Sequence, residues 1–264
     1  MTNIAIGHGD SIVLDDHDGV LVVTLDRPPA NSLDGALIRE LGRLFTDLAS
    51  EQNPPPVVLT GQGGRFFCAG GDIKELDGAH HDDLDSRMRR FHGMLVAIES
   101  YPRPVVAAVN GHCVGGGMEI ALFADVVLAV TTARFGFPEI NHGLLPADKG
   151  IQRASQLLGV RTARRMLLSG ALLDADRAHE LGIVDELVDS EELLAAAVAS
   201  ARTAGSKAPV LYAALKRSVN NPNAEYDEAS FQRTLTAAAE YFDDPMAADL
   251  RQTWNRHRPP KGTR

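Results

Sequence analysis

Two glutamates in glycine-containing segments are the residues of this sequence best suited to acid–base chemistry. Glu119 follows three consecutive glycines, Gly115–Gly117, and Glu139 follows a Phe-Gly-Phe-Pro turn. Adjacent glycines directly ahead of a helix leave backbone N–H groups exposed where the positive end of the helix favours a developing negative charge. Two carboxyl groups near such a site can act as general acid and general base. This stretch therefore predicts an oxyanion site with two acids beside it, although close helix-to-strand packing is an equal explanation for the three glycines alone.

A second glycine cluster predicts a further part of that site. In the segment RFFCAGGDIKEL, Gly70 and Gly71 stand directly before Asp72, which we expect to cap a helix instead of acting as a catalytic group. Backbone N–H groups at the start of such a helix have no intrahelical partners. The segment therefore resembles the first half of an anion hole.

The elements that must hold these residues alternate between strands and helices. Apolar runs bounded by turn residues predict a hairpin over 12–26 and strands over 57–60, 105–109, 125–130 and 183–188. Leucines 37, 41, 44 and 48 recur at helical spacing, with Ser32 or Asp34 as the N-cap. Further helices are predicted over 84–100, 151–158, 161–169 and 174–181. The alternation indicates right-handed βαβ units in an α/β core.

The last part of the chain shows no strand pattern. It is predicted to form helices over 191–203, 209–219, 224–242 and 246–257. We therefore divide the chain into an α/β core, residues 1–189, and a C-terminal helical region, residues 190–264.

Composition excludes several classes of partner. The net charge of −9 and the pI near 5.4 argue against nucleic acid or an anionic membrane as the main partner. No apolar run approaches the ~18 residues that a membrane span needs, and the N-terminus has no signal-peptide pattern. The two cysteines are not at disulfide-framework spacing, which fits a reducing cytoplasm. We expect a cytoplasmic, soluble protein.

Three motifs in order, FCAGGDIKEL (67–76), NGHCVGGGMEIALFADVVLA (110–129) and FGFPEINHGLLP (135–146), resemble the enoyl-CoA hydratase/isomerase superfamily, also called the crotonases. The resemblance implies a crotonase-type spiral of ββα turns with a C-terminal helical domain used for oligomerisation. It also implies an acyl-CoA thioester as ligand and assembly into homotrimers or dimers of trimers.

The resemblance also implies roles for individual residues. Carried over by position, the thioester carbonyl accepts hydrogen bonds from the backbone N–H groups of Gly71 and Gly116. The hydratase branch uses two glutamates, and both matching positions are acidic here, with Glu119 as the base and Glu139 as the donor of the C2 proton. We expect burial to raise the pKa of at least one of them. The implied reaction is syn addition of water to a trans-2-enoyl-CoA, giving a 3-hydroxyacyl-CoA in fatty acid metabolism.

No metal or redox cofactor is implied, because coenzyme A is part of the substrate. The resemblance places the coenzyme A moiety near four residues, Ala30, Ala69, Ile73 and Lys74. Lys74 would contact a phosphate of coenzyme A.

One loop departs from the family pattern. Residues 146–150 read Pro-Ala-Asp-Lys-Gly, where many members have small residues after the proline. Asp148 and Lys149 are most simply a surface pair, with a pocket role for Asp148 as the competing interpretation. His142 either lines the acyl pocket or is a structural histidine. The alternatives to a hydratase are therefore an enoyl-CoA or dienoyl-CoA isomerase, another lyase of the family, and a non-catalytic paralogue that binds acyl-CoA.

Overall fold

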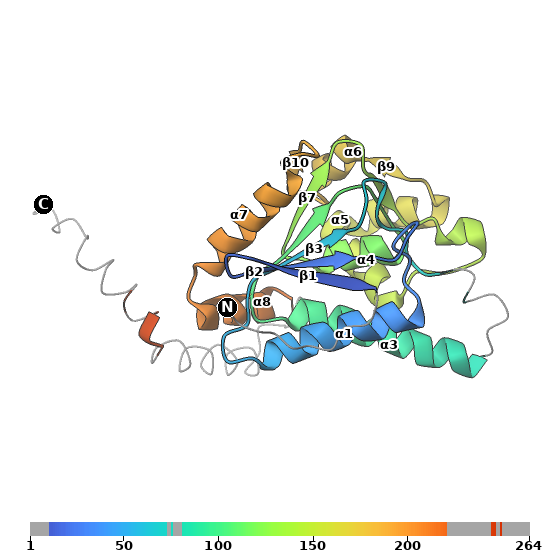
Figure 1. Cartoon of the computed structure of the whole chain (residues 1–264). Coiled ribbons are helices and arrows are strands. Elements are labelled where there is room, and N and C mark those ends of the chain that lie inside the picture. Colours follow the sequence, from blue (N-terminus) through green and yellow to red (C-terminus); the bar gives the residue numbers. More distant parts are fainter. Residues whose placement is uncertain (1–10, 73–74, 76–80, 221–243, 247–248, 250–264) are drawn as a thin grey trace, which may run out of the picture. The chain divides into compact units, whose positions relative to one another are not determined.

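The computed structural model divides the chain into two compact units, residues 1–204 and 205–264. The described residues are 11–72, 75, 81–220, 244–246 and 249, without the side chains of 81–84 and 148 (Figure 1). The first unit continues through helix α7 (Leu193–Gly205) to residue 204, whereas the predicted boundary precedes this helix. A role of the C-terminal region in oligomerisation stays a prediction.

Six strands form the larger sheet, in the order β1-β2-β3-β5-β7-β10. β1 pairs antiparallel with β2, and the other pairs are parallel. The strands are β1 (Ile12–His17), β2 (Val20–Leu25), β3 (Val57–Gly61), β5 (Val105–Val109), β7 (Val126–Val130) and β10 (Glu186–Val188). All five residues of β5 are buried between β3 and β7, which explains its unbroken apolar sequence.

The smaller sheet contains four short strands in the order β4-β6-β8-β9. They are β4 (Phe66–Cys68), β6 (His112–Val114), β8 (Arg134–Gly136) and β9 (Leu173–Asp174). Three times in succession the chain adds one strand to the larger sheet and the next strand to the smaller sheet, as β3 and β4, β5 and β6, β7 and β8. A helical segment follows each pair. This repeat is the spiral of ββα turns expected from the resemblance.

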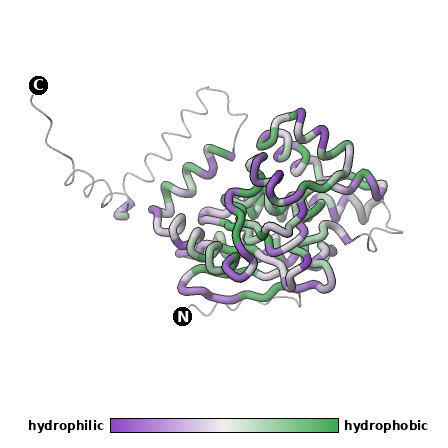
Figure 2. The backbone as a smooth tube through the Cα atoms, turned by 90° about the horizontal axis from the view of Figure 1, so that it is seen from above, coloured by the Kyte–Doolittle hydropathy of each residue, from purple (hydrophilic) through white to green (hydrophobic). Residues whose placement is uncertain are grey.

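The helices of the first unit are α1 (Gly35–Ser50), α3 (His81–Ser100), α4 (Gly116–Phe123), α5 (Asp148–Ser169), α6 (Ala175–Glu180) and α7, with the 3₁₀-helix η1 (Glu139–His142). Helix α8 (Pro209–Val219) belongs to the second unit. α1 and α3 lie side by side (Figure 1). Hydrophobic and hydrophilic residues alternate along the helices in Figure 2, as expected for amphipathic helices. Asp34 is the N-cap of α1, since its side chain accepts a hydrogen bond from Leu37 N–H at 2.7 Å.

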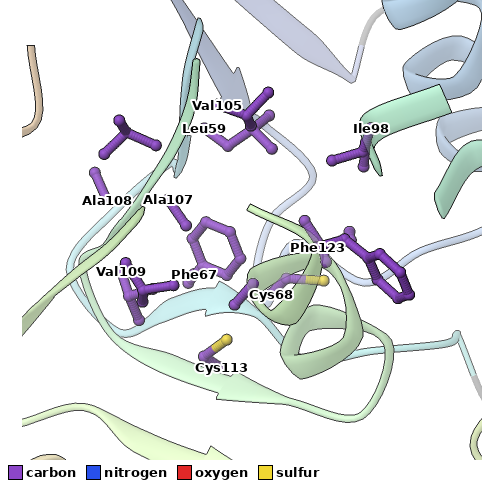
Figure 3. Close-up of a cluster of buried hydrophobic side chains, with 14 of the residues drawn as sticks. Leu59, Phe67, Cys68, Ile98, Val105, Ala107, Ala108, Val109, Cys113 and Phe123 are labelled. Atoms are coloured by element: carbon purple, nitrogen blue, oxygen red, sulfur yellow. The ribbon is translucent and has the colours of Figure 1, made fainter. Parts of the chain in front are cut away.

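The two cysteines are core residues of the smaller sheet. Cys68 of β4 and Cys113 of β6 are neighbours in the strand register, and both thiols are free and fully buried (Figure 3). Burial raises the pKa of Cys68 to about 12 and that of Cys113 well above its ordinary value. Both thiols are therefore protonated packing groups.

The short strands β6 and β8, residues 112–114 and 134–136, were not predicted, because long-range pairing, which local patterns do not reveal, holds these three-residue segments. The helices predicted over 151–158 and 161–169 both lie within α5, which is kinked between them where Gly159 has φ 73° and ψ 150°. The helix predicted over 224–242 lies outside the described residues, as does that over 246–257 apart from 246 and 249.

Candidate active site

Helix α4 carries Glu119 in its first turn and is buried along its whole length. Glu119 itself is 2% exposed. Gly115, the N-cap, has φ 55° and ψ −128°, a conformation that residues with a side chain rarely adopt. A Cβ at Gly115 would also lie 2.7 Å from Oε1 of Glu139. The glycine therefore allows both the turn into α4 and the close approach of the second carboxylate.

The other glycine loop is bound to the segment that precedes α1. Leu33 N–H donates to the carbonyl of Gly70 at 2.8 Å, and Asp72 N–H donates to the carbonyl of Leu33 at 3.0 Å, around an isolated bridge between Leu33 and Gly71. The carboxylate of Asp72 pairs with the guanidinium of Arg27 at 2.7 Å. The backbone around Gly71 is thus held on both sides.

The two glycine loops meet. A Cβ added to Gly70 would lie 2.9 Å from the backbone nitrogen of Gly116 and 3.3 Å from Cα of Gly115. Among the described residues, no hydrogen bond is found for the N–H groups of Gly71 and Gly116, and Gly116 begins α4, where an intrahelical partner is impossible. Two neighbouring backbone donors are therefore available to an anionic atom.

The first turn of α5 closes over Glu119. The backbone N–H of Ala147 donates a hydrogen bond to the Glu119 carboxylate. A Cβ at Gly150 would overlap Oε1 of the same carboxylate, so a side chain there would force Glu119 to move. Oε1 is buried and has no hydrogen-bond partner among the described residues. A buried, unpaired carboxylate oxygen is costly to keep, which is typical of a site that receives a further group.

Glu139 is held by a short turn instead of a buried helix. It opens η1, in which no residue is fully buried, and the left-handed Gly143 ends the turn by donating to the Glu139 carbonyl. Its Oε2 is buried without a partner among the described residues. Residues i and i+3 eclipse in a 3₁₀-helix, so His142 projects from the same side as Glu139.

The pKa values of both carboxyl groups are raised. For Glu119, burial is the main cause, the charge of Glu139 adds to it, and the hydrogen bond from Ala147 opposes it. For Glu139, burial raises the pKa and its own backbone N–H lowers it. Burial is the first cause of both shifts, and Glu119 is the more deeply buried of the two.

Both carboxylates line one cavity of about 300 Å³. The wall comprises Leu33, Ile38, Ala69, Gly70, Gly71, Arg87, Met88, Phe91, Gly115, Gly116, Glu119, Pro138, Glu139, His142, Leu144, Leu145, Pro146 and Ala147. Arg87 is 9% exposed and both of its terminal nitrogens are engaged, one with Glu75 and one with the Leu33 carbonyl at 2.6 Å. The cavity therefore combines an apolar wall with two acids and two unpaired backbone donors.

The structure brings most of the predicted site residues together. Gly71, Gly116, Glu119, Glu139, Ala69 and His142 all line the cavity. Ala30 does not line it, but its carbonyl accepts a hydrogen bond from Ala69 N–H at 3.0 Å. Ile73 and Lys74 lie outside the described residues. Asp148 is the first residue of α5, and its side chain is not among those described.

Lys149 pairs with Glu99 of α3 at 2.6 Å, and the two side chains are only 21% and 16% exposed. The interpretation of Asp148 and Lys149 as a surface pair did not include this contact, and the Asp148 side chain lies outside the described ones. The sequence offered no signal for this contact, because the partners are distant in the chain and belong to different helices.

Three residues of the site were missed. Arg87 lies in α3, and its burial depends on Glu75 and Leu33. Ala147 acts through its backbone N–H, which carries no side-chain signal. The steric need for Gly150 is visible only with Glu119 beside it.

The described residues offer neither a membrane-spanning helix nor a metal cluster. None of their helices is long and apolar enough to cross a membrane. Within the same part of the chain, no group of three or more His, Cys, Asp or Glu residues is arranged to hold a metal ion.

Comparisons with known proteins agree with the fold and the motifs. A family model described as enoyl-CoA hydratase/isomerase matches residues 15–257. A carnitinyl-CoA dehydratase of Citrobacter koseri is 36% identical over 76% of this chain and 76% of its own length. A short-chain-enoyl-CoA hydratase of Clostridium acetobutylicum is 34% identical over 80% of this chain and 81% of its own length. The crystal structure of an enoyl-CoA hydratase from Bacillus anthracis superimposes with a TM-score of 0.86, at 29% identity, over 95% of this chain and 98% of that one.

The ββα spiral and the paired acids define an α/β protein of the crotonase type. The chain belongs to the enoyl-CoA hydratase/isomerase family. The relatives above that carry a functional name are hydratases or a dehydratase, which supports activity of the hydro-lyase type on an acyl-CoA thioester.

Proposed function

We propose that the protein is an enoyl-CoA hydratase that adds water syn across the double bond of a trans-2-enoyl-CoA. One observation carries the proposal: Glu119 and Glu139 line the same cavity, and each has a buried oxygen without a partner in the described structure. Hydration needs one group that takes a proton from water and another that delivers a proton to C2. An isomerase needs only one acid, so the pair favours the hydratase.

The thioester carbonyl is proposed to lie between the backbone N–H groups of Gly71 and Gly116. Addition of water at C3 places negative charge on this oxygen, and backbone donors that are already oriented stabilise it without reorganisation. The absence of other partners for these two N–H groups in the described chain supports the proposal. Loss of one such donor typically costs about 3 to 4 kcal/mol in the transition state.

Glu119 is proposed as the base for water and Glu139 as the donor of the C2 proton. These roles need Glu139 protonated and Glu119 ionised, whereas burial raises the pKa of both carboxyl groups. Substrate binding is proposed to make the two groups differ. An acyl chain in the cavity removes water from the less buried Glu139 and raises its pKa, while the Ala147 N–H continues to stabilise the anion of Glu119.

Further properties follow from the same proposal. The coenzyme A moiety would bind near Ala30, Ala69, Ile73 and Lys74, and His142 and Asp148 would contact the acyl group. No metal or redox cofactor takes part, since general acid–base chemistry and the backbone donors suffice. We propose a cytoplasmic enzyme of fatty acid metabolism that assembles as a homotrimer or a dimer of trimers.

The test is a steady-state assay with crotonyl-CoA, following loss of the conjugated thioester. The wild type, Glu119→Gln and Glu139→Gln are compared with Glu186→Gln, which removes an exposed carboxylate of β10. Each site variant should lower kcat by about 10²- to 10⁴-fold with acyl-CoA binding nearly unchanged, and the control should match the wild type. Full activity in both site variants refutes the assigned roles.

A dehydratase of a 3-hydroxyacyl-CoA is the second candidate, favoured by the 36% identity to a carnitinyl-CoA dehydratase. The same two acids would act in reverse. Turnover of crotonyl-CoA, 3-hydroxybutyryl-CoA and carnitinyl-CoA is measured in parallel. The substrate with the highest kcat/KM identifies the preferred substrate and the direction of the reaction. Double-bond migration in a 3-enoyl-CoA would instead indicate an isomerase. Tight binding without turnover would indicate a non-catalytic acyl-CoA-binding paralogue.

A further inference from the structure

The half-buried ion pair between Lys149 and Glu99 joins three helices around the proposed base. Lys149 Nζ lies 2.6 Å from Glu99 Oε2 and 5.0 Å from the centre of the Phe123 ring. Glu99 belongs to the last turn of α3, Phe123 ends α4, and Lys149 stands in the first turn of α5. Lys149 thus connects the start of α5 to the ends of two other helices.

A second cation of α5 holds the same end of α4. Arg153 donates from Nε to the carbonyl of Leu122 at 3.0 Å, and its guanidinium lies 5.5 Å from the Phe123 ring centre. Carbonyl groups in the last turn of a helix have no intrahelical donor, and cations near this end are favoured. Both cations therefore bind the C-terminal end of the helix that carries Glu119.

The opposite side of the same α5 turn contacts the catalytic carboxylate. Ala147 N–H donates to Glu119, and Gly150 lies so close to Oε1 that a Cβ would overlap it. Lys149 stands between these two residues in the chain. A small displacement of this turn would move the N–H donor and the wall against which the carboxylate rests.

We propose that Lys149 and Glu99 form a positioning clamp that holds the first turn of α5 against Glu119, so that its carboxylate keeps the orientation needed to activate water. Neither residue touches the reacting atoms on this view. The expected effect on kcat rests on the proposed hydratase function. The expected effect on hydrogen exchange of the α5 turn does not.

The charged surroundings of the clamp must be included in its test. Glu119 faces Glu139 from η1, and Lys149 lines a second cavity together with His92 of α3. Burial lowers the pKa of Arg153, while Glu99 and Asp125 raise it. Removal of Lys149 therefore leaves Glu99 beside Arg153, which favours correct folding of the variant.

The experiment compares Lys149→Met and Glu99→Met, two near-isosteric changes that remove opposite charges. If the pair acted only through its electric field, the two variants would shift the acid limb of the kcat–pH profile in opposite directions. A clamp predicts the same direction for both. Loss of the Ala147 hydrogen bond raises the pKa of Glu119, so activity should begin to fall at a higher pH as the solution is acidified.

Both variants should lower kcat by about tenfold or more with KM within about twofold, because a displacement of about 1 Å at a catalytic group is costly. Lys149→Arg keeps the ion pair and should retain most of the activity. The matched control is the exposed pair of Arg89 and Asp85 on α3, whose side chains are 77% and 62% exposed. Arg89→Met and Asp85→Met should behave as the wild type.

Hydrogen exchange of residues 147–151 gives a readout independent of turnover. Both clamp variants should lose protection there, and the control variants should not. Unchanged exchange in Lys149→Met and Glu99→Met, or opposite shifts of their acid limbs, overturns the clamp. If the wild type hydrates no enoyl-CoA, the proposed function fails, and the exchange data alone then decide whether the clamp exists.

Discussion

The two carboxylates of the site are held in opposite ways. Glu119 belongs to α4, in which every residue is buried and which packs against α3 and α5. Glu139 opens η1, a four-residue turn without a fully buried residue. The core thus determines the position of Glu119, whereas local backbone geometry and the absent side chain of Gly115 determine that of Glu139.

This difference suggests separate tasks for the two acids. A carboxylate in a rigid, dry position suits the orientation of a water molecule, and a less buried one can change its protonation when substrate covers it. Four measurements test whether the two acids differ in this way. They follow in order of decreasing expected effect.

The first prediction separates the roles by a partial reaction. Exchange of the C2 protons of butyryl-CoA with deuterated solvent needs a group at C2 but no attacking water. Glu139→Gln should lower this exchange by about 10²- to 10⁴-fold, whereas Glu119→Gln should lower it much less, while both abolish most hydration. Nuclear magnetic resonance of the C2 protons measures the rate. The reverse order would exchange the two assigned roles.

The second prediction compares the packing around the two acids. Ile120 in α4 is fully buried, and Ile140 in η1 is 45% exposed. Ile120→Ala should lower the free energy of unfolding by about 2 to 5 kcal/mol, because it leaves a cavity in the core. Ile140→Ala should change it by less than about 1 kcal/mol. Urea denaturation of both variants checks this, and similar losses would contradict the proposed contrast.

The third prediction concerns the glycine that faces Glu119. Gly150→Ala should lower kcat by about 10²-fold, because its Cβ would displace the Glu119 carboxylate. Gly93→Ala is the matched control. Gly93 lies in α3, and a Cβ added there would have no atom within 4 Å, so the change should stabilise the protein by about 0.5 to 1 kcal/mol without altering kcat. Steady-state kinetics of both variants measures the change in kcat, and thermal unfolding measures the change in stability.

The fourth prediction uses the raised pKa of Glu119. Above the ordinary carboxyl value of 4.5, the unfolded chain has released this proton while the folded protein still binds it. Stability of the wild type therefore falls as the pH rises from that value through the higher folded pKa. Glu119→Gln has no carboxyl group at this position and does not lose stability in this way. Its melting temperature should therefore rise relative to that of the wild type as the pH approaches neutrality. A difference that does not depend on pH would show that the carboxyl is not shifted.

The sequence predicted those parts of the site that depend on local patterns. The turn into α4 follows from Gly115–Gly117, the cap of α1 from Asp34, and the apolar strand β5 from its uninterrupted valines and alanines. The motifs also indicated the family and both glutamates. Each of these signals lies within a few residues, where backbone conformation and hydrophobic burial act directly.

Other features depended on partners distant in the chain. β6 and β8 are too short to be predicted locally and exist because they pair with neighbouring strands. The burial of Arg87 depends on Glu75 and Leu33, which lie on other segments. No local pattern encodes such contacts, since each partner alone looks like an ordinary surface or loop residue.

By itself, the sequence determined the longer strands and helices, the two glycine turns and the identity of the acids, because these depend on side-chain type and local spacing. Only the tertiary structure decided that Gly150 and Ala147 would close over Glu119 and that Lys149 would pair with Glu99. The physical reason is that burial and close approach arise when separate helices pack, and this packing sets the charge and orientation of the catalytic carboxylate.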